Sequence, residues 1–500
     1  MMSYKSSLAG FKRYLERVSA MQQVGSHLFW DSMQKIPPKG TANRAFVRGI
    51  LAEELFKLET SSEMGKYLEE LCPLQDKMDD AEKALIRRSS INFSRFKAVP
   101  PKLFGDFEAI KSAAIPVWDK AFKEGRYADL APVLGQVIDL GKEMCEHIGY
   151  EDKPHSAWIS YHEEGMSPAL LDPFFAELKA AIVPLAEKIS EKNIPRPKFL
   201  SRFVPRDKQQ KLSELVCAKL QLDPEATLLT ETTHPFSFSL YEGDVRFTTR
   251  YHEDNFQSSL FATMHEAGHS IYSLNISPDI ACTILRGGAS AAFHESQSRF
   301  YENIVGRSRE FLSFIYDDMM ELYEPYIGRP SIDELYLGFN YSVPSLIRVE
   351  ADELTYNLHI ILRYEMERDF INGHVDVNDL PAIWNQKIEE SLGLKVTDDR
   401  DGILQDIQWP AGYFGGFVSY ALGNAYNAQI LHTMKKDFDV FGAIGEGNFA
   451  KINEWLREHV HCHGAIYTPS RLIERITGEP LNPKYFINYI TEKFTALYNL

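Results

Sequence analysis

The spacing of apolar residues predicts helices over most of the chain. From residue 3 to about 222, apolar positions recur every three and four residues, as in "LLDPFFAELKAAIVPLAEKI", which is the period of an amphipathic helix. Prolines at 37–38, at 100–101, and at 195 and 197 interrupt this pattern, and a proline disfavours helical backbone in the residue before it. We therefore expect the N-terminal half, residues 1–225, to be a series of helices that break at these prolines.

Residues 226–251 follow a different pattern. The segment "ATLLTETTHPFSFSLYEGDVRFTTRY" alternates polar and apolar residues and turns at Glu242-Gly243-Asp244, which is typical of a short β-hairpin. Helical spacing returns in residues 252–424 and continues in C-terminal helices at 425–500. Because no repeat, low-complexity tract or long linker divides the chain, we expect a mainly α fold in one domain of residues 1–500.

The composition limits the classes of partner. The chain has 70 acidic and 54 basic side chains and a net charge of −16, which argues against nucleic acid or an anionic membrane, because either requires a basic face. The N-terminus lacks the apolar core of a secretory signal, and no uncharged apolar run reaches membrane-spanning length. The five cysteines are scattered without a C-x-x-C pair, as in a reducing compartment, so we expect a cytoplasmic protein.

The segment "TMHEAGHSIY" (263–272) contains an H-E-x-x-H sequence inside a predicted helix. Residues four apart lie on one helix face, so His265 and His269 can bind one metal ion. Glu266 is badly placed as a ligand, but it can reach a water molecule on that ion and accept its proton. The pattern predicts a zinc-dependent hydrolase site that needs a third protein ligand.

The third ligand must come from another helix, because His269 is not followed by the spacing of an extended zinc motif. The predicted helix in "AAFHESQSRFYENIVGRS" (291–308) supplies Glu295, our choice, with His294 and Glu302 as lesser candidates. The alternative for a lone helical glutamate is a solvated face. A second histidine group, "HVHCHG" at 459–464, could hold another metal, but it has no carboxylate or open loop beside it.

Other residues are candidates for binding a substrate. "SLIRVEADELTYNLHIILRYEMER" (345–368) reads as one long helix, in which Arg348 and Asp352 are four residues apart. The apolar neighbours of Arg348 favour a buried guanidinium, held by Asp352 and directed at an anion. The remaining candidates are donors on the hairpin and in the glycine- and aromatic-rich segment 402–424: His234, Arg246, Gln405, Tyr413 and Tyr420.

Together these segments resemble the M32 family of metallocarboxypeptidases over nearly the whole chain. The shared motifs are "HPF" (234–236), "DVRFT" (244–248), "HEAGH" (265–269), "HESQ" (294–297), "IRVEAD" (347–352) and "GILQD" (402–406). The resemblance implies a saddle-shaped helical fold with a deep groove, a homodimer, and removal of single residues from peptide C-termini. It also implies that His265, His269 and Glu295 bind the metal and that Glu266 is the general base.

Two positions depart from the family pattern. Gln408 stands where a histidine is usual before Trp409, and Gly416 and Val418 stand where "G-Y-F-P-T-Y" has tyrosine and proline. Loss of a donor to a tetrahedral oxyanion costs about 3 kcal/mol of transition-state stabilisation, although the amide of Gln408 or the phenols of Tyr413 and Tyr420 can also donate.

We therefore expect a Zn²⁺ carboxypeptidase, with Co²⁺ or Mn²⁺ as possible substitutes, that acts on peptides with a free C-terminus. The alternatives are an oligopeptidase or dipeptidyl-carboxypeptidase that uses the same site, and a metal-binding peptide receptor with impaired chemistry.

Overall fold

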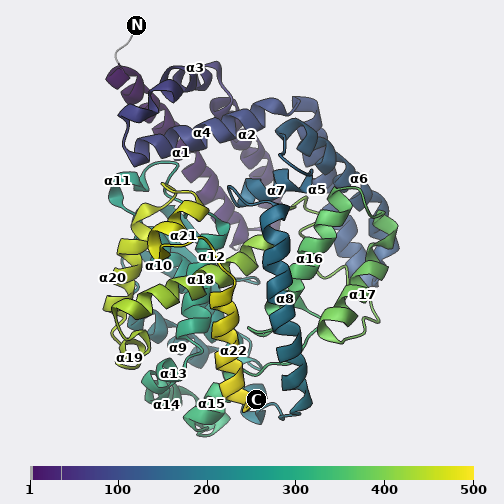
Figure 1. The fold of residues 1–500 in the computed structure, drawn as a ribbon, viewed down its shortest axis with the longest axis vertical. Helices are drawn as coiled ribbons and strands as arrows, with labels where there is room; N and C mark the ends of the chain where they lie inside the picture. Colours follow the sequence, from purple (N-terminus) through teal and green to yellow (C-terminus); the bar gives the residue numbers. More distant parts are fainter. Residues whose placement is uncertain (1–3, 35) are drawn as a thin grey trace.

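Helices make up most of the computed structural model, which describes residues 4–34 and 36–500 (Figure 1). The N-terminal helices are α1 (Tyr4–Met33), α2 (Thr41–Glu59), α3 (Ser62–Leu71), α4 (Asp80–Ala98), α5 (Pro101–Glu124), α6 (Tyr127–Ile148), α7 (His155–His162), α8 (Pro168–Glu191) and α9 (Arg206–Lys219). The predicted breaks are confirmed: α1 ends before Pro37, α5 begins at Pro101, and α8 ends before Pro195.

A second series of helices follows the sheet. These are α10 (Phe256–Leu274), α11 (Pro278–Ala281), α12 (Ala291–Arg299), α13 (Arg309–Phe314), α14 (Tyr316–Ile327), α15 (Ile332–Phe339), α16 (Tyr356–Ile371), α17 (Leu380–Leu392), α18 (Val418–Asp437), α19 (Val440–Gly445), α20 (Phe449–His459), α21 (Pro469–Thr477) and α22 (Lys484–Tyr498). The end of α12 continues as a π-helix, Phe300–Val305. None of the helices in the described residues has an apolar stretch long enough to span a bilayer.

The helix predicted over 345–368 is wrong over residues 345–355, nearly its first half. The helical run begins only at Tyr356, and Arg348–Glu350 forms a single 3₁₀ turn in an otherwise irregular segment. The carboxylate of Asp352 accepts hydrogen bonds from the backbone N–H groups of Leu354 and Thr355. Such local bonds stabilise a turn in competition with a helix, and they delay the start of α16.

The small sheet has three strands rather than the two of the predicted hairpin. Strands β2 (Ser237–Tyr241) and β3 (Asp244–Thr249) pair antiparallel across the turn at Glu242 and Gly243, as predicted. Strand β1 (Thr227–Glu231) pairs parallel with β3, so the strand order is β1-β3-β2. The loop around Pro235 separates β1 from β2, because proline has no N–H to contribute to a ladder.

Three helices meet in the middle of the molecule and position the functional residues. Figure 1 shows α1–α4 at one end and α13–α15 at the other, with α10, α12 and α18 between them. A Cβ atom at Gly268 of α10 would lie 2.5 Å from the backbone oxygen of Gln297, and one at Gly423 of α18 would lie 2.9 Å from Cβ of Glu295. Because neither glycine carries a side chain, both helices press directly against α12.

Candidate active site

The two histidines of the H-E-x-x-H sequence face Glu295 across the contact between α10 and α12. The Nε2 atoms of His265 and His269 each lie 3.7 Å from Oε2 of Glu295, and the three donor atoms lie within 4.8 Å of one another. Two imidazole nitrogens and one carboxylate oxygen at this spacing fit a divalent ion that keeps a position open. We call these three residues the metal site.

Each histidine of the metal site turns its other ring nitrogen to a partner outside it. Nδ1 of His265 lies 2.9 Å from Oε2 of Glu302, which belongs to the π-helix, and Nδ1 of His269 lies 2.9 Å from Nδ1 of His294. Partners of this kind fix the tautomer and orientation of a metal-binding imidazole. The two lesser candidates for the third ligand therefore support the histidines, while Glu295 is the carboxylate that faces both Nε2 atoms.

Arg299 links the two carboxylates around the histidines, a role that the sequence analysis missed. Its Nε donates to Oε1 of Glu295 at 2.8 Å, and its Nη1 donates to Oε2 of Glu302 at 3.2 Å. Burial alone raises the pKa of Glu302, but the charges of Arg299, His265 and Arg307 hold it well below its ordinary value. The signal in the sequence was the spacing of four residues from Glu295 to Arg299 on one helix.

Glu266 is buried beside the metal site with one carboxylate oxygen unpaired. Only 6% of its surface is exposed, and Oε2 has no hydrogen-bond partner among the described residues. Burial raises the pKa of Glu266 to about 7; the charge of His265 opposes this shift and the charges of Glu295 and Glu302 add to it. A carboxylate with such a pKa can accept and release a proton near neutral pH.

Arg348 is buried, as its apolar neighbours predicted, but it pairs with Asp406 and not with the predicted Asp352. Its Nε and Nη2 donate to Oδ1 of Asp406 at 3.1 and 2.9 Å, and Nε of Arg363 donates to Oδ2 at 2.6 Å. Two guanidinium groups thus share one carboxylate, which leaves a buried excess of positive charge. We call Arg348, Arg363 and Asp406 the arginine cluster. The partner differs because Asp352 lies in the turn before α16.

Gln405 braces this cluster and has no free donor for a substrate, which corrects its predicted role. Its Oε1 accepts hydrogen bonds from the backbone N–H of Arg348 and from Nη2 of Arg363, both at 2.9 Å. Its Nε2 donates to the backbone oxygens of Leu346, Asp401 and Gly402. An amide has only two N–H donors, and the protein's own backbone oxygens accept hydrogen bonds from both.

Tyr413 and Tyr420, the two tyrosines predicted to bind substrate, lie within electrostatic range of Glu295 of the metal site. Burial raises the pKa of both phenols, and the charge of Glu295 adds to the shift in each. The ring of Tyr420 also lies under the guanidinium of Arg348, 5.7 Å from its centre. Tyr420 therefore packs against the arginine cluster and also lies within electrostatic range of Glu295.

Among the described residues, no hydrogen bond, ion pair or ring contact joins His234 or Arg246 to the metal site, and their substrate-binding role stays a prediction. Both Arg246 Nε and Nη2 donate to Asp244 on the same strand at 2.8 Å, and its guanidinium lies over the ring of Trp30 in α1. The other face of the sheet packs on α10, where Ser237 bonds to Ser270. His234 is exposed in the loop between β1 and β2. The alternation of polar and apolar residues in the sequence did not show on which face of the sheet these two residues lie.

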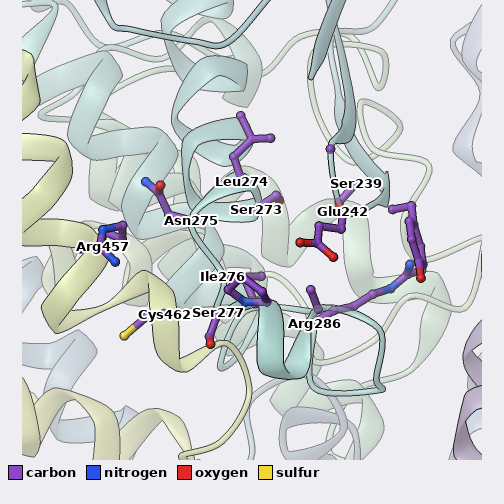
Figure 2. Close-up of a pocket in the computed structure, with 14 residues that line it drawn as sticks. Ser239, Glu242, Ser273, Leu274, Asn275, Ile276, Ser277, Arg286, Arg457 and Cys462 are labelled. Atoms are coloured by element: carbon purple, nitrogen blue, oxygen red, sulfur yellow. The ribbon is translucent and has the colours of Figure 1, made fainter. Parts of the chain in front are cut away.

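The histidines at 459–463 point to separate partners and offer no shared ligand position. The ring of His459 stacks on Trp455 at 4.1 Å, whereas the buried His461 lies between Gln297 and Asn275, with Nε2 2.9 Å from the former and Nδ1 3.2 Å from the latter. Next to this segment, a cavity of about 320 Å³ lies beyond the C-terminal end of α10. Figure 2 shows the residues that line it. None of the predicted site residues lines it.

The fold and the metal site together are those of a mainly helical metallopeptidase. The model of the carboxypeptidase Taq (M32) metallopeptidase family matches residues 10–494, and the chain belongs to this family. It is 38% identical to carboxypeptidase 1 of Bacillus subtilis (strain 168) over 97% of each chain.

Solved structures of carboxypeptidases have the same fold as this chain. A Pyrococcus furiosus carboxypeptidase matches with a TM-score of 0.95 at 31% identity, covering 98% of this chain and 99% of that one. An M32 carboxypeptidase from Deinococcus radiodurans R1 matches with the same TM-score and identity, covering 99% of this chain and 100% of that one. The predicted fold class, family and enzyme class are confirmed.

Proposed function

We propose that this enzyme is a zinc-dependent carboxypeptidase that removes one amino acid at a time from the free C-terminus of peptides. The main support is the position of Tyr420. Its ring lies beside the guanidinium of Arg348, and the charge of Glu295 helps to raise the pKa of its phenol. A peptide whose terminal carboxylate binds at the arginine cluster then has its last peptide bond at the metal site.

Glu266 acts as the general base and later as the general acid. His265, His269 and Glu295 would hold a divalent ion, which when bound would supply Lewis-acid activation of the peptide carbonyl and of a water molecule. Glu266 takes the proton of the attacking water on its unpaired oxygen and gives it to the leaving amine nitrogen. Burial keeps bulk water from competing for this proton and raises the pKa of Glu266 toward neutrality, which suits both transfers.

Arg348 fixes the register of cleavage. Asp406 orients its guanidinium and neutralises only one of the two buried arginine charges, so an anionic group completes the local charge balance. A terminal carboxylate meets this requirement, while a C-terminal amide or a continuing chain does not. Binding at one fixed distance from the metal site selects the last peptide bond.

Further expectations belong to the same proposal. The peptide lies in the groove that the family resemblance implies, and the enzyme is a homodimer. We also expect it in the cytoplasm, and its five free cysteines are consistent with that compartment. The peptidase unit comprises residues 1–500, of which the family model covers 10–494. Zinc is the resident ion, and cobalt or manganese can replace it.

A timed mass-spectrometric digest tests the proposal. One peptide with a free C-terminus and its C-terminal amide are each incubated with the zinc-loaded enzyme and with Glu266→Gln. We expect a ladder of single-residue losses from the free peptide only, and a loss of rate of about 10²–10⁴-fold in Glu266→Gln. Removal of dipeptides, internal cleavage, or hydrolysis of the amide at the same rate would contradict single-residue carboxypeptidase activity.

A further inference from the structure

The ring of Tyr413 occupies the space that a side chain at position 416 would fill. A Cβ atom at Gly416 would lie 2.1 Å from Cε1, 2.2 Å from Cζ and 2.5 Å from the hydroxyl oxygen of Tyr413. Ring and side chain cannot coexist there, because all these distances are far below van der Waals contact. The Tyr413 phenol can therefore take this position only because residue 416 is a glycine.

The loop that carries Tyr413 is held firmly from both sides. Its backbone N–H donates to the oxygen of Gln408 at 2.8 Å, and the backbone N–H of Gly415 donates to buried Glu367 at 3.0 Å. On the other side, Nε2 of His162 lies 3.0 Å from the backbone oxygen of Phe414, and the ring of His162 packs on Tyr413 with centroids 4.6 Å apart. The phenol is thus oriented before any substrate binds.

The hydroxyl of Tyr413 has no hydrogen-bond partner among the described residues, and the charged groups around it are acidic. Burial and the charges of Glu367, Glu163 and Glu295 raise the pKa of Tyr413 to about 12. At neutral pH it is therefore a neutral phenol whose O–H is free to donate, within electrostatic range of Glu295. Tyr420 differs because its ring lies against the cationic Arg348.

We propose that Tyr413 is a catalytic hydrogen-bond donor, which binds the oxygen of the scissile carbonyl as negative charge develops on it, and that it stands in the place of a side chain at 416. The inference rests on the proposed function. No covalent bond to Tyr413 forms and its proton stays on the phenol, because the hydroxyl contributes only a hydrogen bond that strengthens in the transition state. Tyr420, by contrast, serves the carboxylate end of the substrate.

Kinetics of four variants test this assignment with a free-C-terminus peptide. Tyr413→Phe should lower kcat by about 10²–10³-fold, the effect of removing one oxyanion donor, with KM nearly unchanged. Tyr420→Phe, the matched control, should change KM more than kcat. Tyr413→Ser should match Tyr413→Phe, and Tyr413→Ser combined with Gly416→Tyr should recover at least about tenfold of the lost kcat. Metal content and melting temperature are measured for each variant to confirm folding.

A binding measurement separates this inference from the proposed function. A phosphinic peptide, whose tetrahedral P–O⁻ mimics the oxyanion, should bind the zinc-loaded Tyr413→Phe variant about 10²-fold more weakly than the wild type, while a product dipeptide should bind both equally. If the wild type cleaves the peptide but Tyr413→Phe keeps its kcat and its phosphinate affinity, the role of Tyr413 is overturned and the proposed function stands. If the wild type cleaves nothing but Tyr413→Phe selectively loses phosphinate affinity, the proposed function fails, and what remains is a hydrogen bond from Tyr413 to a tetrahedral oxyanion analogue without a catalytic role.

Discussion

The metal site is built on regular helices, whereas the arginine cluster is built on irregular segments. His265 and His269 are one helical turn apart on α10, and Glu295 lies on α12, which touches it at Gly268. In the arginine cluster, Arg348 lies in a single 3₁₀ turn and Asp406 in a loop, and only Arg363 lies in a helix. Ligand geometry is therefore set by helix packing, and carboxylate recognition by a buried network of charges and hydrogen bonds.

The two regions also differ in how they balance charge. Around the metal site, Arg299 pairs with both Glu295 and Glu302, and Arg307 pairs with Glu302. With Glu266 beside them, three carboxylates face two arginines, which favours a bound cation. In the arginine cluster, one carboxylate pairs with two guanidinium groups, and the remaining positive charge favours binding of an anion. The two ends of the last residue of a peptide substrate meet opposite electrostatic requirements. The predictions below test this contrast in decreasing order of expected effect.

The largest effect is expected from Asp406→Asn. This change removes the negative charge with which both Arg348 and Arg363 pair and leaves two buried like charges, which should cost about 3–5 kcal/mol of unfolding free energy. Denaturant unfolding measures the loss. Asp398→Asn is the control, because Asp398 pairs with Arg400 in an exposed salt bridge, and its stability should be nearly that of the wild type. Equal stability of the two variants would contradict a buried charge network.

Glu302→Gln should weaken metal binding while the fold remains. Glutamine can still face Nδ1 of His265 but lacks the charge that fixes the imidazole, and the loss of such a partner typically lowers metal affinity by about 10–100-fold. Competition with a chelator measures the affinity for zinc. Glu321→Gln, at an exposed position of α14, is the matched control for net charge. An unchanged affinity in Glu302→Gln would show that helix packing alone orients His265.

Glu163→Gln should change the pH dependence of stability. Glu163 is fully buried, accepts hydrogen bonds from Ala292 and Ser419, and has its pKa raised by burial to about 7. The native state therefore binds this proton more tightly than the unfolded state, and wild-type stability declines as the pH rises from about 4.5 to 7.

Glutamine stays neutral, so above pH 7 the Glu163→Gln variant should be more stable than the wild type by about 1–3 kcal/mol. Denaturant unfolding of both proteins at several pH values measures the difference, which should vanish at pH 4. A difference that does not depend on pH would exclude a buried ionisation at Glu163.

The smallest effect is expected from Arg246→Gln. Arg246 is paired with Asp244 on the face of the sheet that packs on α1, and a partly exposed pair of this kind contributes little. The steady-state kcat/KM for a free peptide should therefore stay within about threefold of the wild type. A larger loss of kcat/KM would extend the substrate site to this face of the sheet.

The same contrast explains what the sequence could predict. The metal site follows from local periodicity, because a spacing of four residues on a helix implies a shared face, and even the missed Arg299 obeys this rule relative to Glu295. The partner of Arg348 is 58 residues away, in Asp406, and no spacing rule connects two loops at that distance. The spacing of Arg348 and Asp352 suggested a pair because both were assigned to a helix that begins only at Tyr356.

Tertiary contacts also decided the roles of single residues. Gln405 was a reasonable donor by residue type, but the five hydrogen bonds of its side chain are made within the protein. The replacement of tyrosine by Gly416 suggested a lost phenol, and only the three-dimensional structure shows the ring of Tyr413 in that space.

The preference for a peptide acid over its amide tests the central claim most directly. The ratio of kcat/KM for a free peptide to that for its C-terminal amide is measured for the zinc-loaded wild type and for Arg348→Gln, with circular dichroism and zinc content as controls. We predict that the wild type strongly prefers the acid and that Arg348→Gln loses about 10²–10³-fold of this ratio, mainly through the acid. If Arg348→Gln folds, binds zinc and keeps the wild-type ratio, the arginine cluster does not recognise the C-terminus.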